Sequence, residues 1–164
     1  MTVRRELGGL TAVCVSQQQP PERRMQKTVA GSGYSGTPLA KKLGIKSGSR
    51  VLCLAVPENY LSLLEPLPAG VTFPKRASRT IDIAHLFALQ KARLLADLEL
   101  LRATLSPTAA IWVSWPKKVS KVETDITEDT IRGVALPLGL VDVKVCAINE
   151  TWSGLKRVVR KELR

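Results

Sequence analysis

Residues 109–118, with the sequence AAIWVSWPKK, decide the fold of this chain. The first half of the stretch is an apolar run without alternation, which predicts a strand covered on both faces in the middle of a parallel sheet. Pro116 cannot donate a hydrogen bond to a neighbouring strand, so we expect the strand to end at Trp115. Lys117 and Lys118 then begin a loop at the carboxyl end of a central strand. Open α/β sheets usually hold their ligands at this edge.

The segments on either side predict alternating strands and helices. Leucines at helical spacing (Leu94, Leu95, Leu98, Leu101 and Leu105) predict a helix over 90–104. Thr37 is expected to cap a short helix that ends at Gly44, and Asp125 with Glu128 has the spacing of a capping box before a helix that ends at Gly139. Further strands are expected at 50–56, 71–73, 80–87, 141–146 and 155–160, with a helix over 58–64 after the first of them. This order predicts an α/β fold, a Rossmann-like open, mostly parallel sheet with helices on both faces and a C-terminal antiparallel hairpin.

Length and composition indicate one folded domain. The chain has 164 residues, of which 45% are hydrophobic, so it can bury a substantial core. We expect a flexible basic N-terminal segment over 1–33, where runs such as QQQPPERR offer little to bury, and a single Rossmann-like domain over 34–164. Cys14, Cys53 and Cys146 are widely spaced and odd in number, which favours buried reduced thiols over disulfides. A single histidine and no close cysteine pair argue against a metal site. The longest N-terminal apolar run is too short to span a membrane, and we expect a cytoplasmic protein.

The formal net charge of +11 is the strongest bulk feature. Basic residues gather in the N-terminal segment and in the last nine residues, the latter being Lys156, Arg157, Arg160, Lys161 and Arg164. Such a balance is compatible with nucleic acid or another polyanion. Because no nucleic-acid-binding module accompanies the charge, we favour a solvated basic surface.

Three segments resemble an uncharacterised bacterial family, the domain of unknown function 3052 family. They are YSGTPLAKKLGIKSGSRV at 34–51, IWVSWPKK at 111–118 and VDVKVCAINETWSGLKRVVRKELR at 141–164. The VSWPK and ETWSGLK blocks are the more specific parts. The resemblance covers nearly all of the chain after Gly33 and implies no established activity.

The architecture more distantly resembles a degenerate class I methyltransferase fold. Enzymes of that class have a glycine-rich loop after the first strand, which approaches S-adenosylmethionine, and an acidic residue near the end of the second strand, which binds the ribose. Here the loop after the first strand is Ala55-Val56-Pro57-Glu58-Asn59, without glycine, and the region 71–79 offers Lys75, Arg76 and Arg79 instead of an acid. One strand-helix unit is also expected to be missing before Thr80. The resemblance therefore implies a fold, while the sequence lacks the cofactor signal, and we expect no cofactor.

Other candidate chemistry is limited. Ser114 has His85 as its one available imidazole base, but no nucleophile-elbow glycines flank it, so we favour a strand serine and a core or strand-end histidine. Trp115 and Trp152 are expected in loops next to charged groups, where they could line a site or, as we slightly favour, act as packing lids over the core.

These observations favour a non-catalytic binding protein for a partner or an anionic ligand at the carboxyl edge of the sheet. Two alternatives stay open: an S-adenosylmethionine-dependent methyltransferase with an atypical cofactor loop, and a nucleic-acid accessory protein that uses its basic termini. A helix is expected between the strand at 109–115 and the strand at 141–146, which makes the two strands run parallel. The turn at 149–154 should therefore lie beside residues 115–118. We therefore predict no catalytic or metal residues, and one shallow ligand-binding cleft lined by Asn59, Trp115, Lys117, Glu150 and Trp152.

Overall fold

The computed structural model describes residues 36–164, and residues 37–164 form one compact unit. The segment 1–33, for which we expect a flexible basic appendage, lies outside the described residues, as does Cys14. In chain order the elements are α1 Leu39–Leu43, β2 Val51–Leu54, α2 Tyr60–Leu63, β3 Ile83–Phe87, α3 Lys91–Thr104, β4 Ala110–Pro116, η4 Lys118–Ser120, α4 Glu128–Ala135, η5 Leu136–Leu138, β5 Leu140–Ala147, β6 Trp152–Val159 and η6 Lys161–Leu163.

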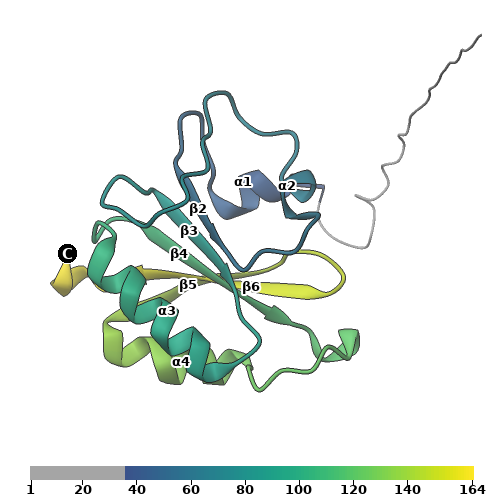
Figure 1. Cartoon of the computed structure of the whole chain (residues 1–164), viewed down its shortest axis with the longest axis vertical. Helices are drawn as coiled ribbons and strands as arrows, with labels where there is room; N and C mark the ends of the chain where they lie inside the picture. The colour runs from purple at the N-terminus through teal and green to yellow at the C-terminus, as the bar shows by residue number, and fades with distance from the viewer. Residues whose placement is uncertain (1–35) are drawn as a thin grey trace, which may run out of the picture. The chain divides into compact units, whose positions relative to one another are not determined.

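The five strands in the described part of the chain form one sheet in the order β2-β3-β4-β6-β5. β2, β3 and β4 are parallel, and β6 runs antiparallel to both of its neighbours, so β5 points in the same direction as β4. Helices α1 and α2 cover one face of the sheet, and α3 and α4 cover the other (Figure 1). The predicted Rossmann-like sheet with its C-terminal antiparallel hairpin is confirmed.

The sheet has one hydrophobic core on each face, and strand β4 contributes to both. Ile111, Val113 and Trp115 pack towards α3 and α4, whereas Trp112 packs towards α1, where its indole Nε1 donates to the carbonyl of Leu43 at 3.0 Å. This burial on both faces is what the apolar run predicts. The strand nevertheless continues through Pro116, one residue further than expected.

Several local predictions are wrong in detail. The helix expected over 58–64 is a single turn, and the weak strand expected at 71–73 is only an isolated bridge between Arg50 and Thr72. Leu95 is exposed, while the other four leucines of the α3 pattern are buried. Gly44 does end α1, with φ of 85°, whereas α4 ends already at Ala135 and Gly139, with φ of 81°, ends the 3-10 turn η5 that follows it.

Both predicted helix N-caps are also wrong. Thr37 does not cap α1, because Pro38 occupies the cap position without a side-chain hydrogen bond. At α4 the cap is Thr127, whose hydroxyl accepts the N–H of Thr130, rather than Asp125. The Asp125 carboxylate instead accepts the N–H of Lys91 at 2.7 Å, at the start of α3. Asp125 therefore joins two loops, and the real cap lies two residues later in the chain.

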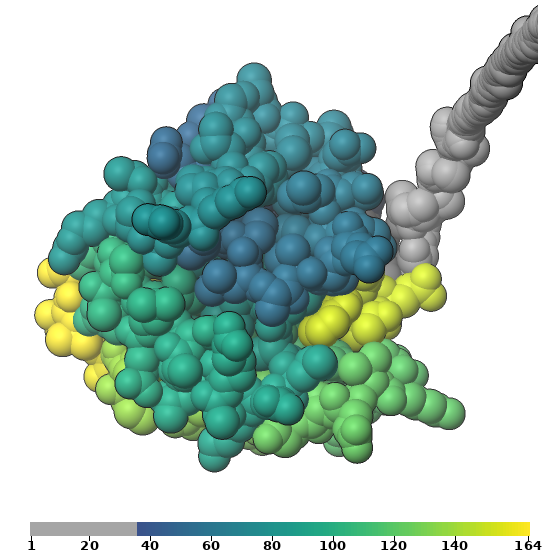
Figure 2. All heavy atoms as spheres, viewed as in Figure 1, coloured from purple at the N-terminus to yellow at the C-terminus, as the bar shows by residue number. Residues whose placement is uncertain are grey.

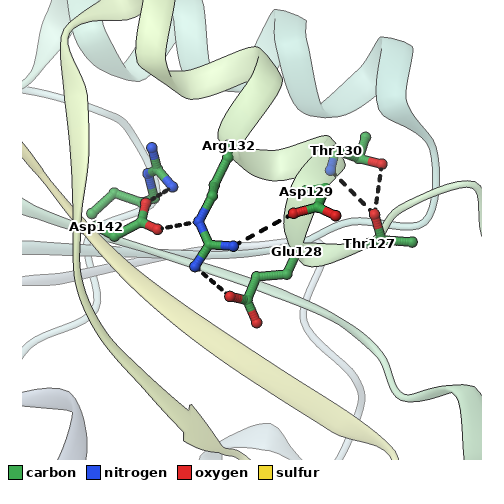
Figure 3. Close-up of polar contacts among 7 residues, drawn as sticks. Thr127, Glu128, Asp129, Thr130, Arg132 and Asp142 are labelled. Carbon is green, nitrogen blue, oxygen red and sulfur yellow. Dashed lines mark hydrogen bonds and ion pairs between the residues drawn. The ribbon is translucent and has the colours of Figure 1, made fainter.

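A charged network ties α4 to the β5–β6 hairpin. In Figure 3, Arg132 lies between Glu128 and Asp129 of its own helix and Asp142 of β5, with Arg132 Nε 2.5 Å from Asp142 Oδ2. On its other side Asp142 pairs with Arg157, which is fully buried and also donates to the carbonyl of Leu140 at 2.7 Å. Arg157, expected among the exposed basic residues of the C-terminus, is thus a core residue.

The remaining features limit the available chemistry. Cys53 and Cys146 are free thiols but only half-buried, so the prediction of buried cysteines is partly wrong. Burial raises the pKa of Cys53 to about 11, which keeps this thiol protonated at neutral pH. Within residues 36–164, no group of three or more histidine, cysteine or acidic side chains could hold a metal ion. In the same part of the chain, no helix has the length and apolar character needed to cross a bilayer.

Candidate functional site at the carboxyl edge

The end of β4 and the turn between β5 and β6 meet at the carboxyl edge of the sheet. Pro116 pairs with Trp152 across the β4–β6 ladder, and the Lys117 N–H donates to the Thr151 carbonyl at 2.7 Å. In Figure 2 the bright green loop after β4 accordingly projects close to the yellow turn between β5 and β6. The turn and the lysine loop therefore lie side by side, as the parallel direction of β4 and β5 requires.

The two tryptophans of the predicted cleft belong to strands and face opposite sides of the sheet. Trp115 lies inside β4, is 9% exposed and packs in the core under α3 and α4. Trp152 begins β6, is half-buried and packs on the other face, with its ring 4.9 Å from that of Phe87 in an edge-to-face arrangement. The register explains this separation: Trp115 pairs with Ser153, so Trp152 falls one residue out of step and points the other way. The expectation that both rings lie in loops is wrong.

The three polar residues of the predicted cleft lie near strand ends at the same edge. Asn59 is exposed just before α2, and Glu150 is exposed in the turn after β5. Lys117 is half-buried, and its carbonyl accepts the Ser120 hydroxyl at 2.6 Å at the start of η4. The structure thus gathers these residues at one edge, while the rings of Trp115 and Trp152 support that edge from opposite faces.

A buried chain of three side chains lies beneath this edge. The hydroxyl of Tyr60 is 2.6 Å from His85 Nδ1, and His85 Nε2 is 2.6 Å from the hydroxyl of Ser114. These residues come from α2, β3 and β4, and all three are fully buried. Phe87 stacks on the histidine ring at 4.6 Å, and Tyr60 meets it edge-on at 5.1 Å. Sequence reasoning paired His85 with Ser114 and missed Tyr60, which lies 25 residues away in the chain.

Burial determines what this chain of side chains can do. Desolvation lowers the pKa of His85 to about 3, so its imidazole is neutral at physiological pH, and burial also raises the pKa of Tyr60. A neutral imidazole has one N–H and one acceptor nitrogen, which matches one hydrogen bond on each side. The geometry resembles a serine beside a base. Because neither the serine nor the histidine reaches solvent, no substrate can approach the hydroxyl, and we assign the chain of bonds a structural role.

The fold is that of S-adenosylmethionine-dependent methyltransferases. One similar solved structure is a SAM-dependent methyltransferase from Aquifex aeolicus, with 16% identity over 74% of this chain and 87% of that chain and a TM-score of 0.53. The PH0226 protein from Pyrococcus horikoshii OT3 is similar at 11% identity over 74% and 86% of the two chains, with a TM-score of 0.53. A methyltransferase from Mesorhizobium loti matches at 10% identity over 73% and 95%, with a TM-score of 0.50. These likenesses establish the fold alone. No protein-family model matches the sequence, and the search of curated proteins found no match.

The residues at the carboxyl end of β2 do not fit the methyltransferase cofactor. The loop 55–59 has no glycine, Ala55 occupies the left-handed region at φ 54°, and Pro57 has no N–H to offer. Immediately afterwards the chain turns into α2, which buries the ring of Tyr60 against His85 and Phe87. Where the second strand of the class would supply an acid, only the bridge at Thr72 remains, followed by exposed Lys75, Arg76 and Arg79.

Proposed function

We propose that this protein is a non-catalytic binding protein built on a methyltransferase-like fold, and that it binds a partner protein at the carboxyl edge of its sheet. The observation that carries the proposal is the position of Tyr60. Its fully buried ring packs against His85 and Phe87 of β3 and bonds to His85, directly after the loop that would approach a cofactor. A side chain packed in this way is part of the core under α1 and α2, so opening a cofactor site there would disrupt that core.

The surface formed by the loops after β3 and β4 has the mixed character of a protein-binding site. It combines exposed apolar side chains with three lysines, and Val119 is 80% exposed. Its loops are held together, because the Leu89 carbonyl accepts both the Asp125 N–H at 3.2 Å and the Thr124 hydroxyl at 2.7 Å. We call it the carboxyl-edge surface and define it by Leu89, Lys117, Lys118, Val119, Lys121 and Val122.

The composition of the carboxyl-edge surface indicates the kind of partner. Apolar side chains that lie in water favour burial against another protein, and the lysines favour acidic groups on it. Of the five predicted ligand-binding residues, Lys117 belongs to this surface, and we propose that Asn59 and Glu150 border it. Trp115 and Trp152 would then hold it in place from the two faces of the sheet.

A capture experiment tests the proposal. The full-length chain is used as bait in an extract of its native host, beside a Lys118→Glu, Val119→Asp variant. A matched control, Lys161→Glu with Leu100→Asp, makes corresponding changes at exposed positions of η6 and α3 that lie outside the carboxyl-edge surface. We expect a stoichiometric partner that the wild-type and control chains retain and the carboxyl-edge variant loses. A partner retained by all three, or no partner at all, would contradict the proposal.

The methyltransferase alternative is favoured by the fold of the similar structures, and calorimetry decides it. We expect no heat of binding when S-adenosylmethionine is titrated to millimolar concentration into the full-length chain. Saturable binding would restore the enzymatic alternative.

The nucleic-acid alternative predicts an affinity for DNA or RNA that falls steeply with salt. The position of Arg157 argues against the nucleic-acid alternative, because this basic residue of the C-terminus is buried and paired with Asp142.

We also propose membership of the domain of unknown function 3052 family. Support comes from the two blocks that carry the resemblance, VSWPK and ETWSGLK, which are neighbours in the fold. Pro116 of the first pairs with Trp152 of the second. Sequence motifs that meet at one edge of the sheet are consistent with a shared site there.

A further inference from the structure

A second, concave site lies at the opposite edge of the sheet. This pocket has a volume of about 430 Å³ and is formed by the end of α1, the turn before β2, the starts of β3 and β4, and Lys156 of β6. Leu43 and Gly44, at the end of α1, line it, so it lies on the face of the sheet that α1 covers. Its size is within the range of about 300 to 1,000 Å³ that is typical of small-molecule sites. The pocket shares no residue with the carboxyl-edge surface.

Two lysines, Lys46 and Lys156, line this pocket. A Cβ atom placed on Gly44, at the end of α1, would stand 3.9 Å from Lys156 Nζ, and Lys46 lines the same pocket. Directly opposite Lys156 in the β5–β6 ladder is Lys144, whose amino group donates to the Lys42 carbonyl at 3.2 Å. Within residues 36–164, no carboxylate forms an ion pair with Lys46, Lys144 or Lys156.

This arrangement is unfavourable without an anion. Like charges directly opposite each other on neighbouring strands destabilise a sheet, and the β5–β6 ladder places Lys144 opposite Lys156. An anion held between Lys156 and Lys46 would offset that repulsion. Binding of an anion in the pocket would thus explain why Lys156 lies opposite Lys144, a pairing that does not stabilise the sheet.

The pocket also offers hydrogen-bonding groups of both kinds. Neither the hydroxyl nor the backbone N–H of Ser47 makes a hydrogen bond with any residue in the described part of the chain, so both can donate to an anion. Asp82, the one acid among the lining residues, accepts the Arg50 N–H through Oδ2 at 2.9 Å. Its second oxygen can accept a further hydrogen bond. A ligand that suits these groups has an anionic end and a separate hydroxyl or amino group.

We propose that this pocket binds a small phosphate ester. Lys46, Lys156 and the Ser47 donors hold the phosphate, and Asp82 accepts a hydrogen bond from a hydroxyl or amino group on the rest of the molecule. Lysine is well suited to phosphate as a point charge with three donors. A pocket with Asp82 in its lining favours a small molecule over a nucleic-acid strand, which needs an extended basic track. Nucleoside phosphates and sugar phosphates share this chemistry.

Calorimetry on the full-length chain in phosphate-free buffer tests the proposal. The probes are adenosine 5′-monophosphate and ribose 5-phosphate, with adenosine as the phosphate-free comparison. We expect at least one ester to bind and adenosine not to bind. If only the nucleotide binds, the base is recognised as well, whereas equal binding of both esters assigns the site to the sugar phosphate.

Variants locate the site. Lys156→Gln and Lys46→Gln are each expected to weaken ester binding at least tenfold, while Lys91→Gln, on the opposite face of the sheet, should change it by less than twofold. Because Lys144 and Lys156 repel each other, Lys156→Gln should melt no lower than the wild-type chain. If it fails to fold, Lys46→Gln, in an exposed turn, provides the same test.

Three results would overturn the proposal. They are no binding of either ester at millimolar concentration, equal weakening by Lys91→Gln, or a single-stranded oligonucleotide that binds far more tightly than both esters. Partner capture and ester titration probe opposite edges of the sheet, so either of them can fail while the other succeeds.

Discussion

His85 Nε2 lies 2.6 Å from the hydroxyl of Ser114, across two neighbouring parallel strands. With Tyr60 on the other ring nitrogen, the hydrogen bonds join α2, β3 and β4 in the interior of the protein. The side chains of Tyr60, His85 and Ser114 all have hydrogen-bond partners, which is the condition under which a buried polar network is tolerated. The network therefore makes the folded state dependent on a neutral histidine.

Acid should destabilise the protein through His85. The folded state holds the pKa of His85 at about 3, against an ordinary value of 6.5, so between these values the unfolded chain binds more protons. The stability that comes from keeping His85 neutral is fully present above its ordinary pKa and is lost as the pH falls below that value. We expect the free energy of unfolding in urea to drop by about 2 kcal/mol between pH 7.5 and pH 5.

His85 is the only histidine in the sequence, which makes a control available. His85→Gln should remove most of this pH dependence. If that variant does not fold, the single histidine resonance of the wild-type chain can be followed by NMR, and it should not titrate above pH 5. A resonance that titrates near pH 6.5 would show that the ring reaches solvent.

Removing the hydroxyl of Ser114 should cost more than its size suggests. Ser114→Ala leaves a buried histidine nitrogen without a partner, with an expected loss of about 1 to 3 kcal/mol in urea unfolding at pH 7.5. Ser62→Ala, at an exposed position of α2, is the matched control and should change stability by less than about 0.5 kcal/mol. Equal effects of the two substitutions would mean that the His85–Ser114 hydrogen bond contributes nothing.

The elements that could be predicted from the sequence are those with strong local signals. The unbroken apolar run of β4, the leucine spacing of α3 and the alternating valines of β5 each depend on a few consecutive residues. Even there, Leu95 was expected on the buried face of α3 and is exposed, because periodicity alone does not set how wide a face the sheet covers.

The candidate site was harder to predict because it depends on contacts between distant residues. The shared edge of Lys117 and Glu150 followed from strand direction, which the crossover helix determines. The opposite faces of Trp115 and Trp152 follow from the β4–β6 register, which no local pattern encodes. Tyr60 lies in a single helical turn with no distinctive signal, so its bond to His85 could be found only in the folded structure.

The phase of α3 can be checked with two leucines of the same helix. Leu98 is fully buried against the sheet, whereas Leu100 is 56% exposed. Leu98→Ala should lower the free energy of unfolding by about 2 to 5 kcal/mol, since it leaves a cavity in the core. Leu100→Ala should cost less than about 1 kcal/mol. A loss below 1 kcal/mol for Leu98→Ala would contradict the packing of α3 described above.

Asp142 should be more important to stability than its position on an edge strand suggests. Its carboxylate is the partner of the buried Arg157, whose Nε has no hydrogen-bond partner among residues 36–164, so Asp142→Ala leaves a charge in the core with little compensation. We expect a loss of about 3 to 5 kcal/mol in urea unfolding. The double variant Asp142→Ala, Arg157→Met removes the buried charge as well and should recover a large part of that loss, because an apolar side chain needs no partner. Asp129→Ala, which removes an exposed ion-pair partner of Arg132, is the control and should cost less than about 1 kcal/mol. If the double variant is no more stable than Asp142→Ala alone, the loss comes from the hairpin itself and not from an unpaired arginine.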